Sequence, residues 1–361
     1  MRVVSLECVD FRNLSAATMT LGPEITVMHG PNGAGKTNLL EAFHFGLTGS
    51  SFRSGPDRDL IRFDRPTARV ELELELDRGR RSRLLAALER GGDRRHLLDG
   101  APPPPLDRRA SAAVFHPDRL QLLKGPPAHR RAHLDRFVAE CWPARGDLRA
   151  RFGRTLAQRN ALAARVRAGL AAPAGLAIWD ERFAAEAEEL IAARTAAAAA
   201  LSAPFAAAAE RLGLPEAELG YRPRAEGAAA AIAERLAELR AVEPGRSYLS
   251  YGPQSDELEL RAGGRPLRRF GSQGQQRTAL LALLLAERTA LLAAARPAPV
   301  LLLDDVMSEL DPGHRELLVE ALSGTGQVLI TATEPEHVPT AARAFRVAVG
   351  GGAVRDLASA A

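Results

Sequence analysis

The chain of 361 residues contains little cysteine, little lysine, few aromatic side chains and no long apolar run. Two cysteines, Cys8 and Cys141, exclude a disulfide framework or a Cys-rich zinc site and favour a reduced compartment. The most apolar stretch, 279–295, is interrupted by Glu287 and Arg288 before it reaches the ~20 apolar residues that span a bilayer. The N-terminal segment lacks the apolar core of a signal peptide. We therefore expect a cytoplasmic protein with no membrane span.

The charged residues are unevenly distributed. Residues 119–168 contain twelve Lys and Arg against three Asp and Glu, whereas residues 180–243 contain seven against twelve. The basic segment fits a face that binds phosphate backbones, and it fits a solvated helical surface equally well. Aromatic residues make up only 5% of the chain, which argues against base stacking along a single strand as the main way of binding nucleic acid.

The residue pattern predicts an α/β fold with an inserted, mainly helical subdomain. Strand-like segments are expected at 2–10, 18–28, 71–77, 300–303 and 327–331, and helices near 275–294 and from 312. The first ~75 residues are expected to form strands around one helix, and the apolar run 300–303 suits a parallel strand that is covered on both faces. The fold would combine a parallel sheet with antiparallel strands.

Between residues 130 and 242 the composition changes to Ala, Leu, Glu and Arg with helical spacing. We expect a helical lobe at 129–244, inserted into a head formed by 1–128 and 245–361. Four prolines are expected to limit the length of any helix in the lobe, namely Pro173, Pro204, Pro215 and Pro244.

Residues 30–37 fit the phosphate-loop pattern G-x-x-x-x-G-K-[ST] between a strand-like and a helix-like segment. Backbone N–H groups and the lysine of such a loop bind nucleotide phosphates, and its hydroxyl ligates Mg²⁺. The alternative, a glycine-rich turn that matches by chance, is rare in a chain whose only lysines are Lys36 and Lys124. We expect ATP and Mg²⁺ at this loop, with Lys36 catalytic and Thr37 a metal ligand; the predicted ATP-binding residues are Gly30, Pro31, Asn32, Gly33, Ala34, Gly35, Lys36 and Thr37.

The apolar strand 300–303 ends in two carboxylates, Asp304 and Asp305. Mg²⁺ needs an acidic ligand on a neighbouring strand of the same sheet, which we assign to Asp304. We expect Asp305 to orient or deprotonate the attacking water. A pair of helix-capping residues in a turn is the alternative.

The segment 272–276, Ser-Gln-Gly-Gln-Gln, precedes the apolar helix and fits either a phosphate site or an ordinary helix cap. In company with the phosphate loop and the acidic pair, it resembles the signature motif of the ABC-type ATPases, which caps the nucleotide bound by the opposite subunit. The resemblance implies contacts in trans from Ser272, Gly274, Gln275 and Gln276. It also implies a D-loop at Ser308 and Asp311, which crosses the same dimer interface.

Segments along nearly the whole chain are similar to the RecF family of bacterial recombination mediators: 11–14, 38–42, 51–53, 115–118, 120, 130–131, 134–135, 179–180, 189–191, 194, 271–277 and 304–305. The chain departs from the family pattern at Gln254 and Glu257, where His and Asp are expected. No histidine occupies the switch position near Thr331 and Thr333, and no glutamine aligns in the predicted Q-loop at 115–118. A contact from either threonine to the γ-phosphate is our expectation in place of the histidine.

The resemblance implies a slow, DNA-dependent ATPase of DNA replication, DNA repair and the SOS response. Two subunits would close around two Mg·ATP on double-stranded or gapped DNA and act with RecR, and indirectly RecO, to load RecA. It implies that Arg12 and Arg53 contact the nucleotide, with surface salt bridges as the open alternative. Arg130 and Arg131 are candidate DNA contacts, and we expect the neighbouring His133 to be solvated.

Two other functions are compatible with these motifs. One is a transporter-associated ATPase subunit. Against it, the 235 residues between Lys36 and Ser272 are more than the compact insert that separates the same two motifs in such a subunit. The other is a scaffold that binds ATP without hydrolysing it, against which the intact acidic pair argues.

Overall fold

The computed structural model describes the chain except residues 77–78, 105–110, 243–249, 340–343, 352 and 357–361. Its central sheet has the strand order β14-β13-β3-β12-β11-β7 and is parallel except between β13 and β14. The expected strand at 300–303 is confirmed as a buried parallel strand between two neighbours. The bounds are β3 (Ile25–His29), β7 (Ala112–Phe115), β11 (Val300–Leu303), β12 (Val328–Ala332), β13 (Phe345–Gly350) and β14 (Ala353–Asp356).

A second, antiparallel sheet has the order β2-β1-β4-β5-β6. Alternating burial along β4 and β5 reflects one face on the core and one in water, as their period-two sequence predicts. The expected strand at 18–28 is in fact divided, since one strand ends at Thr20 and the next begins at Ile25. The bounds are β1 (Arg2–Phe11), β2 (Leu14–Thr20), β4 (Thr67–Glu75), β5 (Arg81–Glu89) and β6 (Arg94–Leu98).

The central sheet lies between two apolar cores because successive side chains point to opposite faces. Met28 and Leu302 belong to the core that contains α1 (Lys36–Thr48) and the antiparallel sheet. Val27 and Leu301 belong to the core on the other face, which contains α8 (Gln273–Ala293) and α9 (Pro312–Leu322). The inner parallel strands β3, β12 and β11 therefore have almost no face left for water, which explains why most of their residues are apolar.

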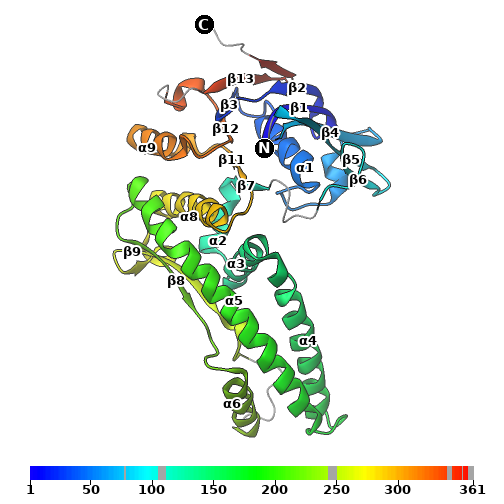
Figure 1. The fold of residues 1–361 in the computed structure, drawn as a ribbon, viewed down its shortest axis with the longest axis vertical. Helices are drawn as coiled ribbons and strands as arrows, with labels where there is room; N and C mark the ends of the chain where they lie inside the picture. The colour runs from blue at the N-terminus through cyan, green and yellow to red at the C-terminus, as the bar shows by residue number, and fades with distance from the viewer. Residues whose placement is uncertain (77–78, 105–110, 243–249, 340–343, 352, 357–361) are drawn as a thin grey trace.

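The lobe extends away from the two sheets (Figure 1). Its helices are α3 (Pro127–Cys141), α4 (Leu148–Arg167), α5 (Gly175–Arg211) and α6 (Ala229–Val242), and it also contains a strand, β8 (Ala217–Arg222). The expectation that Pro204 limits the length of a helix is wrong, because the 37-residue helix α5 continues through it. Phe205 and Leu201 are completely buried beside this proline, so packing holds a helix that the backbone disfavours.

Helix α5 is the one helix in the described part of the chain that is long and apolar enough to cross a membrane. Its buried residues pack against α4, α6, α8 and β8. A core helix of a folded protein passes the same test of length and composition.

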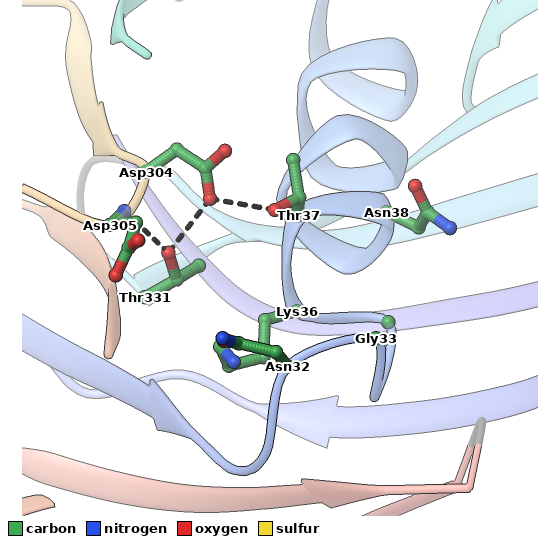
Figure 2. A pocket seen from close by; sticks show the side chains of 9 residues that line it. Asn32, Gly33, Lys36, Thr37, Asn38, Asp304, Asp305 and Thr331 are labelled. Atoms are coloured by element: carbon green, nitrogen blue, oxygen red, sulfur yellow. Dashed lines mark hydrogen bonds between the residues drawn. The ribbon is translucent and has the colours of Figure 1, made fainter. Parts of the chain in front are cut away.

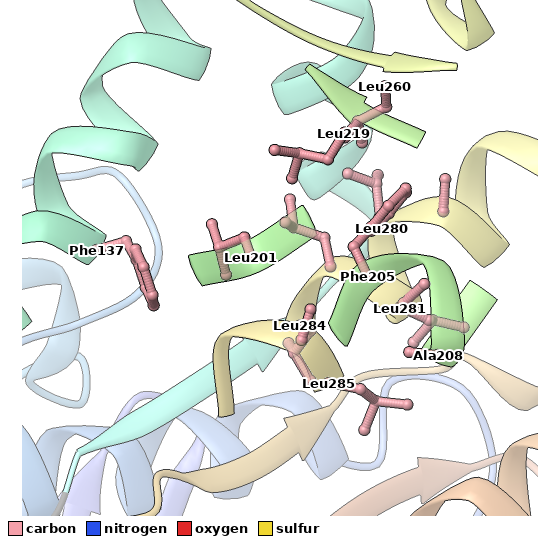
Figure 3. Packing of buried hydrophobic residues seen from close by; sticks show 14 of the residues in the cluster. Phe137, Leu201, Phe205, Ala208, Leu219, Leu260, Leu280, Leu281, Leu284 and Leu285 are labelled. Carbon is pink, nitrogen blue, oxygen red and sulfur yellow. The ribbon is translucent and has the colours of Figure 1, made fainter. Parts of the chain in front are cut away.

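The predicted division at residue 244 stays a prediction, but two features join the lobe to the later part of the chain. Strand β8 pairs with β9 (Glu257–Ala262) in the sheet β10-β9-β8. Leu201 and Phe205 of α5 lie in one core with Leu280 and Leu284 of α8 (Figure 3). The remaining elements are α2 (Leu120–Lys124), α7 (Leu267–Phe270), β10 (Arg265–Pro266) and the 3₁₀ turns η1 (Asp57–Leu60), η4 (Pro117–Arg119), η5 (Pro143–Arg145), η6 (Pro253–Ser255), η7 (Met307–Glu309) and η8 (Pro335–His337).

Candidate nucleotide-binding site

The phosphate loop joins β3 to α1 at the carboxyl edge of the central sheet. Gly35 caps α1 with a left-handed backbone, φ 106°, which glycine adopts without strain. Gly30 packs so closely on β13 that an added Cβ would lie 2.0 Å from the Val349 oxygen. The loop is therefore fixed by backbone packing, with the N-terminus of α1 facing its concave side.

Lys36 lies inside the loop that precedes it. Its Nζ donates to the carbonyl oxygens of Gly30 at 2.6 Å and Pro31 at 3.0 Å. Burial lowers the pKa of this ammonium, and the nearby Asp305 and Asp304 partly offset that effect. The lysine is thus the cation of a small polar cavity that also contains the acidic pair.

Thr37 and the acidic strand end meet directly. Thr37 Oγ1 donates to Asp304 Oδ1 at 2.9 Å, and Thr331 Oγ1 donates to the same oxygen at 2.8 Å (Figure 2). A hydroxyl and a carboxylate are ligands that Mg²⁺ accepts, so Thr37 and Asp304 fit the predicted metal role. They line a cavity of about 260 Å³ together with Asn32, Gly33, Gly35, Lys36, Asn38, Asp305 and Thr331.

Asp305 has an unusual conformation for a residue with a side chain. Its φ of 51° is left-handed, and its N–H donates to Thr331 Oγ1 at 2.8 Å. Its Oδ1 is buried and has no hydrogen-bond partner among the described residues. A buried acceptor without a partner is costly in a folded protein, and such a group at a cavity wall is available to a bound water.

The two threonines proposed in place of a switch histidine differ in position. Thr331 lines the cavity, but its hydroxyl is used by Asp304 and by the Asp305 N–H. Thr333 does not line the cavity, and its Oγ1 lies 3.2 Å from His337 Nδ1. The geometry therefore favours Thr331 as a support for the acidic pair rather than as a phosphate ligand.

Arg12 and Arg53 both bind Glu41, and Arg53 also donates to Oδ1 of Asn38, a residue that lines the cavity, at 2.9 Å. Their contact with the nucleotide stays a prediction. Glu41 lies on α1 and is completely buried. Arg12 forms two hydrogen bonds to it, at 2.8 and 2.9 Å, and Ser51 Oγ donates to it at 2.6 Å. Three of the family-like segments, 11–14, 38–42 and 51–53, thus meet at one carboxylate, and the arginines complete a buried ion cluster.

The segment 115–118, which lacks a Q-loop glutamine, lies beside the acidic pair. The Asp304 N–H donates to the Phe115 oxygen at 2.8 Å, and the His116 ring lies 5.7 Å from that of Phe52. Burial lowers the pKa of His116. The ring contact between His116 and Phe52 connects segment 115–118 with segment 51–53.

The signature segment begins α8 with a capping box. Ser272 Oγ accepts from the Gln275 N–H at 3.2 Å, and the Gln275 side chain accepts from the Ser272 N–H at 2.9 Å. Ser272, Gly274 and Gln275 are exposed and do not line the cavity of their own chain. An added Cβ at Gly274 would meet only Ser272 Oγ, at 3.9 Å. This helix N-terminus is therefore open to an anion from outside the chain.

Gln276 does not fit the predicted contact in trans. It is buried, and its Nε2 donates to the carbonyl oxygens of Leu267 at 2.9 Å and Gly271 at 3.1 Å. It fixes the turn between α7 and α8, which holds Ser272 in place.

The predicted D-loop follows Asp305 directly. Ser308 Oγ donates to the Asp305 oxygen at 3.0 Å, and Asp311 caps α9 by accepting from the His314 N–H at 3.1 Å. Hydrogen bonds from His314 lower the pKa of Asp311. An ion pair between Glu309 and Arg277 connects this loop with α8.

The predicted DNA contact at Arg130 is wrong, because this guanidinium is buried and bound within the chain. It forms hydrogen bonds of 2.6 and 3.2 Å with Glu257, a residue that departs from the family pattern. Arg131 donates to the Asp256 oxygen at 2.9 Å. The expected solvated position of His133 is also wrong, since it is buried against Glu287. Sequence spacing gave no signal for these contacts, which join residues more than 120 positions apart.

Comparisons with known proteins agree with this geometry. The family model of the RecF/RecN/SMC N terminal domain matches residues 2–354. The DNA replication and repair protein RecF of Heliobacterium modesticaldum is 36% identical over 92% of both chains, and that of Anaeromyxobacter sp. (strain Fw109-5) is 38% identical over 95% of both.

Solved structures extend the agreement to the fold. The recombination mediator protein RecF-ATP in the RecFOR pathway superposes with a TM-score of 0.82 at 24% identity and covers 99% of this chain and 98% of its own. An SMC head bound to the C-winged helix domain of ScpA gives 0.58 at 15% identity and covers 98% of this chain and 97% of its own. The head fold is therefore that of the RecF and SMC ATPases, and the chain belongs to the RecF family of DNA replication and repair proteins.

Proposed function

We propose that this protein is an ATP hydrolase that closes as a head-to-tail dimer on DNA. The observation that supports this most is the division of the site into two halves. Lys36, Thr37 and the acidic pair surround one cavity, while the exposed, capped Ser272 lies outside that cavity. Each nucleotide would be held by the phosphate loop of one chain and by Ser272, Gly274 and Gln275 of the other.

Within this site each residue has a distinct proposed role. Lys36 and the N–H groups at the start of α1 bind the β- and γ-phosphates, and Lys36 stabilises the charge that develops during transfer. Thr37 and Asp304 would hold Mg²⁺, which supplies charge neutralisation for the phosphates when it is bound. Asp305 orients the attacking water and accepts its proton, for which its free Oδ1 is suited.

Binding of ATP would drive closure because the γ-phosphate contacts both chains, and hydrolysis would remove that contact and reopen the dimer. A slow turnover suits a clamp better than a motor. The names of the relatives support action in DNA replication and repair, and the RecFOR pathway of the solved RecF-ATP structure supports RecR and RecO as partners. We propose RecA loading as the outcome. We propose double-stranded or gapped DNA as the partner nucleic acid and the cytoplasm as the location.

The test is analytical ultracentrifugation with and without Mg·ATP, each in the presence and absence of a short duplex. The variants are Ser272→Arg and Gly274→Leu, because both residues are exposed and a Cβ added at Gly274 meets only Ser272 Oγ, at 3.9 Å. Ser272→Arg also removes the capping hydroxyl of α8, at a cost of about 1 kcal/mol that should still permit folding. Ser202→Arg, at an exposed position of α5, is the matched control. Wild type and control should dimerise only with ATP, and both site variants should stay monomeric while still binding ATP. A wild-type monomer under every condition would refute the head-to-tail mechanism, and a dimer without hydrolysis would favour the scaffold.

A further inference from the structure

Strand β9 lies in the middle of its sheet, yet one of its edges is only partly paired. β8 pairs with all six residues of β9. On the opposite edge, β10 has two residues, Arg265 and Pro266, which pair only with Ala262 and Arg261. In the described part of the chain, residues 257–260 therefore have no strand on that side. Such an edge offers main-chain hydrogen bonds to another extended chain.

A cavity of about 450 Å³ lies along this open edge. Part of its wall is apolar, formed by Leu123, Leu258, Leu260 and Pro266. The polar part consists of Arg130, Glu257, Glu259, Arg268 and Arg269. An edge strand beside an apolar hollow has the two features that strand addition uses: main-chain bonds give affinity, and pockets for alternate side chains give specificity.

The exposed, unpaired charges at the rim of this cavity are positive. Its two acidic residues are neutralised inside the chain, Glu257 by Arg130 at 2.6 Å and Glu259 by Arg222 and Arg261, both at 2.7 Å. Arg268 and Arg269, in contrast, are exposed, and neither forms an ion pair with a described residue. Arg269 lies over the exposed Phe270 ring, with its guanidinium carbon 5.3 Å from the ring centroid. Free cations beside an apolar wall complement a segment with alternating acidic and apolar side chains.

We propose that the open edge of β9 and this cavity bind an extended, acidic segment of a protein partner by strand addition. The partner's main chain pairs with residues 257–260, its apolar side chains enter the hollow, and its carboxylates meet Arg268 and Arg269. This site is separate from the cavity of the phosphate loop, with which it shares no lining residue.

Helix α7 and its hydrogen bonds with Gln276 connect the docking site to the proposed signature motif. Arg268 and Arg269 lie on α7, and Gln276 of α8 bonds to Leu267 and Gly271 at the two ends of that helix. A partner that fixes α7 thereby fixes the turn that positions Ser272. An effect on ATP-dependent dimerisation follows, and this consequence alone rests on the proposed function.

The experiment measures binding of a fluorescent nine-residue peptide of alternating valine and glutamate by anisotropy, without nucleotide. Two control peptides replace glutamate by lysine, or the central valine by proline, which cannot donate to a strand edge. The acidic peptide should bind wild type at least tenfold more tightly than either control peptide. Arg268→Glu/Arg269→Glu should weaken it at least tenfold, whereas Arg154→Glu/Arg165→Glu, an equal charge change on exposed residues of α4, should not.

Amide hydrogen exchange supplies the second readout. The acidic peptide should slow exchange at residues 257–260 on the wild type and not on the double variant. Equal binding of the acidic and lysine peptides, equal loss in both double variants, or unchanged exchange at β9 would overturn the proposal. Protection of β9 by higher protein concentration alone would assign the edge to a second copy of this chain and would overturn it too. Because no ATP is present, failure here leaves the dimer mechanism intact, and a wild type that fails to dimerise leaves the docking result intact.

Discussion

Arg277 of α8 and Glu309 of the loop after the acidic pair form an ion pair, so the proposed signature motif and D-loop of one chain are tied together. The Arg277 side chain is 18% exposed and that of Glu309 37%, so solvent screens this ion pair only in part. The two segments that would face the partner subunit are therefore presented as one rigid unit. A rigid unit loses less conformational entropy when two chains dock.

Reversing one charge of this pair should weaken ATP-dependent dimerisation. We expect Arg277→Glu to reduce the dimer affinity at least tenfold, because two carboxylates would then repel and displace the D-loop. The exchanged pair Arg277→Glu/Glu309→Arg should recover most of the affinity. Sedimentation with Mg·ATP measures both variants, and a double variant as weak as the single one would contradict this coupling.

Asp305→Asn should lower the rate of ATP hydrolysis about 10²- to 10⁴-fold and prolong the lifetime of the ATP-bound dimer. Asparagine adopts the left-handed φ of 51° as readily as aspartate, so the fold should be unaffected. The variant loses only the carboxylate that accepts the proton. Phosphate release and dimer lifetime measure the effect, and an unchanged lifetime with normal hydrolysis would refute the assigned base.

Thr331→Val should destabilise the protein by about 1–3 kcal/mol, since it leaves the Asp305 N–H without its partner and removes one of the two hydroxyls that donate to Asp304 Oδ1. It should also lower hydrolysis, because the acidic pair loses its support. Thr333→Val is the matched control, because Thr333 Oγ1 lies 3.2 Å from His337 Nδ1 and forms no contact with the acidic pair in the described part of the chain. Urea denaturation and ATPase assays should separate the two variants, and equal effects would contradict the role of Thr331.

Glu287 should make stability depend on pH. Burial alone would raise the pKa of this carboxyl, but His133 and Arg119 lower it to about 2. Because the folded pKa lies below the unfolded value, the unfolded chain binds more protons, and this contribution is present above about pH 4.5 and lost as the pH falls toward 2.

Glu287→Gln should cost about 3–5 kcal/mol at pH 7, since it leaves Arg119 buried without its counter-charge. The difference in unfolding free energy from wild type should shrink as the pH is lowered from 5 toward 3. Glu320→Gln, on an exposed position of α9, should change stability by less than about 0.5 kcal/mol. A difference for Glu287→Gln that does not vary with pH would contradict the ionised state.

The parts of the site that the sequence predicted well are local in the chain. The phosphate loop, the acidic strand end and the capped start of α8 each depend on neighbouring residues, whose pattern is visible in a single segment. Parallel strands that end at one sheet edge then bring Thr37 to Asp304 across 267 positions. That meeting follows from the strand order in the structure, where only β12 separates β3 from β11.

The contacts that the sequence did not predict depend on which distant residue lies beside each charged side chain. Arg12 and Arg53 resemble free cations in the sequence, but Glu41 is buried between them. Arg130 lies in a basic segment of the sequence, yet it forms an ion pair with Glu257, a residue that departs from the family pattern. A sequence pattern gives the charge of a side chain and not the partner that neutralises it.

Pro204 has a mechanical consequence. A proline in α5 has no N–H for the Ala200 oxygen, so one turn of this 37-residue helix is held by side-chain packing instead of a backbone bond. The packing comes from Leu201 and Phe205 in the core shared with α8. We expect tension along the lobe to unwind α5 at this turn before its other turns. This turn lies beside α8, the helix that begins with the proposed signature motif.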